Sequence, residues 1–94
     1  MMTDEQIKAM ILLKLYKRGS WGGSRTAFDN LRKDFKAKEL GGGSLKRVDD
    51  LGKELIREGL LLAKPTHYGL QVSLNPGQNQ TIRTTITRFF PEFE

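Results

Sequence analysis

The chain has 94 residues, of which 37% are hydrophobic and 29% are charged, and it contains no cysteine. This length corresponds to one small domain, and the composition is that of a globular protein rather than a disordered or membrane protein. The sequence has no apolar run of about 18 residues, the length of a transmembrane helix, and its start does not resemble a secretory signal peptide. Without cysteine, a disulfide framework, a zinc knuckle and a thiol nucleophile are excluded. We therefore expect one cytoplasmic domain over residues 1–94.

The charge balance is basic. Sixteen Lys and Arg residues against eleven Asp and Glu residues give a net charge of +5. Such a surplus is compatible with a polyanionic partner, but runs of charge are also common solubility features. The cations concentrate in one segment, where only Asp29 and Asp34 oppose them: Lys14, Lys17, Arg18, Arg25, Arg32, Lys33, Lys36 and Lys38. Phosphate contact and simple solvation both stay open for this run.

A first helix is predicted over about residues 4–18. Thr3 and Gln6 have the spacing of a capping box, and acidic side chains at the helix start suit its positive end. The segment 7–16 is apolar on nearly every side, which indicates a helix that is buried from several directions. Gly19 ends it.

A second helix is predicted over about residues 25–35, with Ser24 or Thr26 as its N-cap. Its apolar stripe consists of Phe28, Leu31 and Phe35. Trp21 precedes it in a glycine-rich turn. That side chain has two possible roles, stacking on a nucleic-acid base or capping the core between the first helix and a later hairpin; the usual burial of Trp favours the second.

A third helix is predicted over residues 45–58, after a turn at residues 41–43 and with Ser44 as its N-cap. Gly59 stands where a left-handed C-cap is expected. One arc of this helix is the core side and consists of Leu45, Val48, Leu51, Gly52, Leu55 and Ile56. The opposite arc carries Lys46, Asp50, Lys53 and Arg57, with Arg47 and Glu54 on its flank. Gly52 on the core side indicates a close approach of the first or second helix.

A hairpin and a last helix follow. The segments 60–64 and 70–74 are predicted strands around a five-residue turn, so that the hairpin covers about residues 60–75. The last helix is predicted over about residues 80–90, with an apolar face of Ile82, Ile86, Phe89 and Phe90. Phe89, Phe90 and Phe93 are compatible with a homodimer seam and equally with packing on the first helix of the same chain.

This order of elements, with Leu55-Ile56-Arg57-Glu58-Gly59-Leu60-Leu61 leading from a helix straight into a hairpin, resembles the winged helix-turn-helix family. Residues 64–76 look like the wing of its prokaryotic, especially archaeal, members. The loop from Lys36 to Gly43 is longer and richer in glycine than the family's usual short turn. The resemblance implies an α+β fold: a winged helix-turn-helix with a three-helix core, a two-stranded β-hairpin wing and a short C-terminal helix.

The resemblance also implies duplex DNA binding, with helix 45–58 in the major groove and the wing against phosphate or the minor groove. The protein would then be a transcriptional regulator or a chromatin-associated, nucleoid-located factor. The candidate phosphate contacts of the second helix and its following loop are Arg25, Arg32, Lys33, Lys36 and Lys38. The other candidate DNA-binding residues are Ser44, Lys46, Arg47, Asp50, Lys53 and Arg57 at the third helix, and Lys64, His67 and Tyr68 on the wing.

Several alternatives stay open. The cations of the third helix would be a merely solvated face if i,i+4 pairs such as Lys46–Asp50 and Asp49–Lys53 form. At the wing tip, Tyr68 is expected to fold back on the hairpin unless it touches DNA, whereas His67 is equally compatible with exposure and contact. Because the third helix carries equal numbers of acidic and basic residues and the first is very apolar, a protein-interaction module in a larger assembly is the rival function. Structured RNA is a third possible partner.

Enzyme chemistry finds no support in the sequence. A single His and no Cys leave no organised nucleophile, metal cage or general base. The glycines before Ser44 superficially resemble a phosphate-binding loop, but the Lys-Ser/Thr pair and the preceding strand of a P-loop are missing. We therefore expect a non-catalytic protein with no cofactor, no metal, no small-molecule substrate and no membrane partner.

Overall fold

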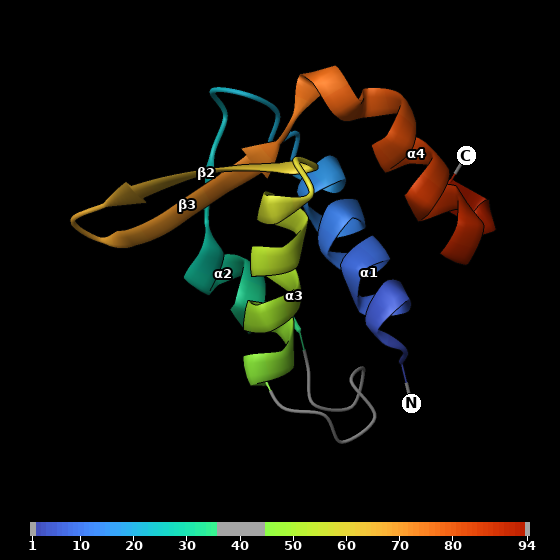
Figure 1. Cartoon of the computed structure of the whole chain (residues 1–94), viewed down its shortest axis with the longest axis horizontal. Coiled ribbons are helices and arrows are strands. Elements are labelled where there is room, and N and C mark those ends of the chain that lie inside the picture. The colour runs from blue at the N-terminus through green and yellow to red at the C-terminus, as the bar shows by residue number, and fades with distance from the viewer. Residues whose placement is uncertain (1, 36–44, 94) are drawn as a thin grey trace.

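The computed structural model describes residues 2–35 and 45–93 (Figure 1). Over these residues the fold is α+β, with four α-helices and a three-stranded antiparallel sheet. In chain order the elements are α1 (Asp4–Lys17), β1 (Thr26–Ala27), α2 (Phe28–Lys33), α3 (Leu45–Arg57), β2 (Leu61–Thr66), β3 (Gly69–Leu74), the 3-10 helix η1 (Pro76–Gln78), α4 (Asn79–Phe89) and the 3-10 helix η2 (Pro91–Phe93). Among the described helices, none has both the length and the apolar character to cross a membrane.

Helix α1 is the centre of the packing. Its predicted capping box is confirmed, because the Thr3 hydroxyl accepts a hydrogen bond from the Gln6 amide and the Gln6 side chain accepts one from the Thr3 amide. The helix ends at Lys17, and Gly19 follows with a φ of 67°, in the left-handed region that glycine adopts at low cost. Helices α3 and α4 both pack on α1 (Figure 1), which explains why it is apolar on nearly every side.

The predicted start of the second helix is wrong. Helix α2 begins at Phe28 and ends at Lys33 because Thr26 and Ala27 are extended and pair with Val72 and Gln71 of β3. Neither Ser24 nor Thr26 is its N-cap: Ala27 occupies that position, and the Thr26 hydroxyl hydrogen-bonds with Ser20. Phe28, Leu31 and Phe35 are nevertheless buried, Phe35 beyond the helix end. The short strand β1 thus joins the hairpin in a sheet of order β1-β3-β2.

The predicted five-residue hairpin turn is also wrong. Strands β2 and β3 remain paired as far as Thr66 and Gly69, so that only His67 and Tyr68 form the turn. Gly69 has a φ of 116°, which supplies the backbone conformation that this tight reversal needs. The longer strands carry the hairpin well beyond the helices, and it projects to one side of the molecule in Figure 1.

Helix α3 begins and ends close to its predicted limits. Val48, Leu51, Gly52 and Leu55 are buried as predicted, whereas Leu45, one turn ahead of the first buried residue, is 43% exposed. Gly59 has a φ of 82°, as expected for the glycine after a helix end. The predicted N-cap Ser44 and the turn at residues 41–43 lie outside the described residues.

Helix α4 and the aromatic residues complete the core. Ile82 and Ile86 are fully buried, and the half-buried Phe90 and Phe93 pack against the same core. Phe93 meets the ring of Tyr16 edge-on at 4.8 Å between centroids. The structure therefore uses these two phenylalanines within the chain, and a homodimer seam stays a prediction.

Trp21 is half-buried against the core, as expected of a cap between α1 and the hairpin strands. Its ring meets Tyr16 of α1 edge-on at 5.6 Å, and its backbone forms an isolated bridge with Leu74 of β3. The core itself draws on all four α-helices and on the sheet: Ile7, Ile11, Leu12, Leu13, Leu15, Phe28, Leu31, Phe35, Val48, Leu51, Leu55, Leu61, Val72, Leu74, Ile82 and Ile86. The overall arrangement is compatible with a winged-helix layout.

Candidate nucleic-acid interface

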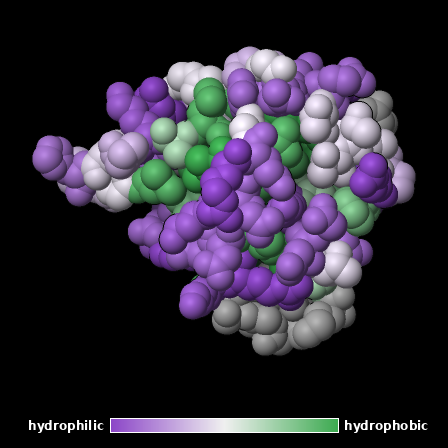
Figure 2. Space-filling view, in the orientation of Figure 1, coloured by the Kyte–Doolittle hydropathy of each residue, from purple (hydrophilic) through white to green (hydrophobic). Residues whose placement is uncertain are grey.

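The outward face of α3 carries one row of charged side chains. Lys46, Asp50, Lys53 and Arg57 recur at i, i+4, i+7 and i+11, so they lie along a single face of the helix, and all four are exposed. We call these four residues the outer stripe. In Figure 2 the surface over α3 is hydrophilic, and apolar surface shows beside it, toward the hairpin. The outer stripe is the arrangement that was predicted for a groove-reading helix.

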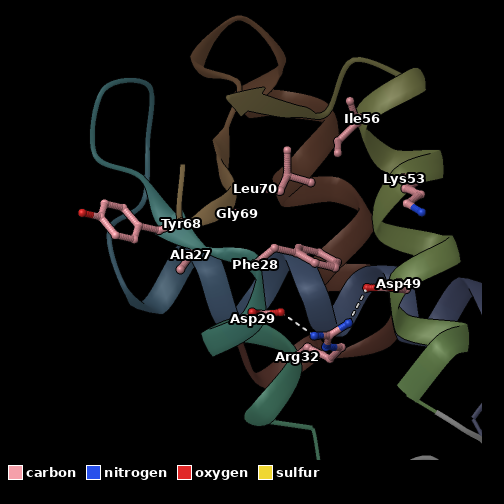
Figure 3. A pocket seen from close by; sticks show the side chains of 10 residues that line it. All are labelled: Ala27, Phe28, Asp29, Arg32, Asp49, Lys53, Ile56, Tyr68, Gly69 and Leu70. Atoms are coloured by element: carbon pink, nitrogen blue, oxygen red, sulfur yellow. Dashed lines mark hydrogen bonds and ion pairs between the residues drawn. The ribbon is translucent and has the colours of Figure 1, made fainter. Parts of the chain in front are cut away.

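On one flank of the outer stripe, the carboxylate of Asp49 forms an ion pair with α2. Asp49 accepts a hydrogen bond from Nη1 of Arg32 at 3.1 Å, and the same guanidinium also pairs with Asp29 of its own helix (Figure 3). Arg32 was predicted to contact phosphate. In the structure its guanidinium is instead bonded to two carboxylates, and it joins α2 to α3.

On the other flank, the carboxylates of Glu54 and Glu58 pair with Lys8 of α1. Its ammonium lies 3.0 Å from Oε1 of Glu54 and 3.0 Å from Oε2 of Glu58, and its side chain is only 8% exposed. Burial by itself lowers the pKa of Lys8, but the hydrogen bonds to Glu54 and Glu58 and their negative charges outweigh it, so the pKa of Lys8 is raised above its ordinary 10.5. Lys8 therefore remains charged at neutral pH and compensates the carboxylates beside it.

These pairs change the charge that α3 presents. Arg47, predicted to flank a DNA-binding face, donates instead to Asp4 at 2.9 Å and to the carbonyl oxygen of Met2 at 2.9 Å. Helix α3 has four basic and three acidic residues, and Glu58 follows its last residue. Asp49, Glu54 and Glu58 are all paired with cations of other helices. Within the described residues, the ions of α3 that make no ion pair are those of the outer stripe: Lys46, Asp50, Lys53 and Arg57. The in-helix pairs Lys46–Asp50 and Asp49–Lys53, on which the alternative of a merely solvated face rested, are not formed among the described residues.

The hairpin presents exposed polar residues at its tip. Lys64 and His67 are exposed, and Tyr68 is 96% exposed, so the expectation that Tyr68 folds back on the hairpin is wrong. Thr66 holds the turn, because its hydroxyl donates to the Gly69 carbonyl at 2.7 Å and accepts from the Tyr68 amide at 3.2 Å. With its backbone fixed in this way, the Tyr68 ring is held clear of the protein.

The basic run between residues 14 and 38 is divided among different roles. Lys14 lies 5.0 Å from the centroid of the Phe35 ring, and Arg18 pairs with Asp34, so both hold α1 to the segment after α2. Arg25 is exposed just before β1, and Lys33 is exposed at the last residue of α2. The remaining predicted contacts Lys36, Lys38 and Ser44 lie outside the described residues.

A cleft of about 210 Å3 lies between the start of α2, α3 and the turn end of the hairpin (Figure 3). Its apolar lining comes from Ala27, Phe28, Ile56 and Leu70, and its charged lining from Asp29, Arg32, Asp49 and Lys53. Tyr68 of the hairpin turn and Gly69, the first residue of β3, complete it. The cleft thus connects the flank of the outer stripe with the hairpin.

The sequence contained one signal for the cross-helix pairing that the prediction missed. Lys8 and Lys14 interrupt an otherwise apolar segment of α1, and a lysine at such a position needs carboxylate partners once it is buried, as Lys8 is. Which carboxylates it meets depends on how α3 packs on α1.

In comparisons with known proteins, no protein-family model, curated protein or solved structure matches this chain.

Proposed function

We propose that this protein is a winged helix-turn-helix protein that binds duplex DNA. Helix α3 would enter the major groove with its outer stripe, and the β2–β3 hairpin would be the wing. The order of helices and strands, the antiparallel pairing of the short β1 with β3 and the projecting hairpin support this proposal. The protein would act as a transcriptional regulator or as a chromatin-associated factor, without catalysis.

The observation that carries the proposal is the pattern of charge on α3. The carboxylates on both flanks of the outer stripe are paired with Arg32 and Lys8, which leaves the side chains of Lys46, Lys53 and Arg57 exposed, with Asp50 between them. Long cationic donors on one face of a helix suit guanine edges and phosphates. Asp50 suits a cytosine amino group, because a carboxylate accepts hydrogen bonds.

The contacts to the DNA backbone would come from neighbouring elements. In a helix-turn-helix protein the helix before the reading helix crosses the backbone, so Arg25 and Lys33 are the phosphate contacts that we propose from the described part of this region. On the wing, Lys64 suits phosphate, and the exposed ring and hydroxyl of Tyr68 suit a sugar-phosphate or a base.

The two features that favoured a protein partner have another explanation in the structure. The apolar residues of α1 are buried in the core of the chain itself. The neutral sum over residues 45–58 hides a cationic outward face, because Asp49, Glu54 and Glu58 pair with cations of other helices, whereas the outer stripe has three cations and Asp50. The two observations that suggested a protein-interaction module therefore no longer favour it. Binding to structured RNA is distinguished from binding to duplex DNA by the test below.

The test is binding of the full chain to a fluorescently labelled random-sequence duplex. The affinity is measured by fluorescence anisotropy at two salt concentrations. If three phosphates are contacted, raising the salt from about 50 mM to about 200 mM should weaken binding roughly 40-fold. A hairpin RNA competitor should displace the duplex poorly. No binding at the lower salt, affinity that does not respond to salt, or stronger competition by RNA would contradict the proposal.

A further inference from the structure

Arg32 sits beside the outer stripe without being part of it. It is on α2, its side chain is 33% exposed, and its guanidinium holds Asp29 of α2 and Asp49 of α3 (Figure 3). Lys53 lines the same cleft as this ion-pair network. The ion pairs that join α2 to α3 therefore lie beside Lys53, a residue of the outer stripe.

Asp49 has a second possible partner on its own helix. Lys53 follows it at i+4, and an acidic residue four positions before a lysine is the favourable orientation for such a pair. In the structure Asp49 is paired with Arg32 instead, and Lys53 is exposed and makes no ion pair with any described residue. Arg32 and Lys53 thus compete for one carboxylate, and Arg32 holds it.

We propose that Arg32 is a positioning residue for DNA binding, which withdraws Asp49 from Lys53 and so leaves the Lys53 ammonium available to the nucleic acid. This inference rests on the proposed function. It assigns Arg32 a different part from the direct phosphate contact expected from the sequence, because the guanidinium is already bonded to two carboxylates. The bridge also holds α2 against α3, and the test has to separate that structural part from the electrostatic one.

Two variants make the separation. In Arg32→Gln, Asp49 loses its cationic partner and should turn to Lys53, so the affinity for duplex DNA should fall about eightfold at about 0.1 M salt, the loss of one phosphate contact. The slope of log affinity against log salt should become less steep by about 0.9. In Arg32→Gln/Asp49→Asn no carboxylate is left to capture Lys53, so both affinity and slope should return to those of the wild type.

The outcomes decide between the possible roles of Arg32. Equal losses in the single and the double variant would overturn the inference, because Arg32 would then contact DNA itself or act only through the helix packing. If Arg32→Gln does not fold, Asp49→Asn alone decides: it should bind at least as tightly as the wild type, and a severalfold loss would refute the proposed role.

Failure of this inference can be told apart from failure of the proposed function. Lys53→Ala is the reference variant for that purpose. If the wild type binds no duplex DNA, or Lys53→Ala leaves its affinity unchanged, the proposed function of the outer stripe fails and this inference fails with it. If Lys53→Ala weakens binding but Arg32→Gln does not, only the positioning role of Arg32 is refuted.

Discussion

Gly52 of α3 and Phe28 of α2 pack directly on each other. A Cβ atom added at Gly52 would lie 2.5 Å from Cζ and 2.6 Å from Cε1 of the Phe28 ring, closer than non-bonded atoms approach. The missing side chain therefore allows α2 and α3 to come together at this point. Along with the Arg32–Asp49 pair, this contact sets how α3 lies against α2.

We expect Gly52→Ala to destabilise the protein. Alanine favours a helix over glycine by roughly 0.5–1 kcal/mol, but the added methyl group must displace the Phe28 ring in a packed core, which typically costs about 1–3 kcal/mol. The free energy of unfolding, measured by urea denaturation, should therefore fall. Gly23→Ala is the matched control, because nothing lies within 4 Å of a Cβ at that position. A Gly52→Ala variant more stable than the wild type would show that the ring moves away at little cost.

The contribution of Lys8 to the stability of the protein should be lost at high pH. The pKa of Lys8 in the folded chain is raised above 10.5, so its contribution is fully present below about pH 10.5 and is lost as the pH rises through the folded value. Lys8→Met, with a side chain of similar length, lacks this contribution. The difference in free energy of unfolding between wild type and Lys8→Met should be constant from pH 7 to about pH 10 and shrink above it. A difference that does not change with pH would mean that the pairs with Glu54 and Glu58 contribute nothing to stability.

Tyr68 offers a test in which binding and stability separate. Because its side chain is 96% exposed, Tyr68→Ala should leave the free energy of unfolding within about 0.5 kcal/mol of the wild type. If the ring stacks on the nucleic acid, its removal should weaken duplex binding at least about fivefold. Tyr68→Phe retains the ring, so it tells a stacking role from one of the hydroxyl group. Unchanged affinity in Tyr68→Ala would exclude the Tyr68 side chain from the interface.

The features predicted correctly from the sequence are those that neighbouring residues determine. The capping box of Thr3 and Gln6, the left-handed Gly59 and the buried side of α3 are all local patterns, and the structure has each of them. The hairpin was predicted for the same reason. Its turn was predicted too long because Pro65 and Gly69 are typical turn residues, although here both belong to paired strands.

The features that were missed depend on contacts between distant parts of the chain. Thr26 and Ala27 form a strand only because β3 lies beside them, and two residues carry no periodicity that would reveal it. The same is true of the candidate site. The exposed row from Lys46 to Arg57 follows from helical spacing, but the pairing of its flanking carboxylates with Arg32 and Lys8 depends on how three helices pack.

The central claim is that the outer stripe of α3 binds DNA phosphates and bases, and a matched pair of variants tests it most directly. Lys53→Ala/Arg57→Ala removes two cations from the stripe, whereas Arg83→Ala/Arg88→Ala removes two cations from exposed positions on α4. The measurement is the slope of log affinity for duplex DNA against log salt. The stripe variant should bind more weakly with a slope less steep by about 1.8, two phosphate contacts, and the control should match the wild type. Equal effects of the two variants, or a stripe variant that binds like the wild type, would contradict the account.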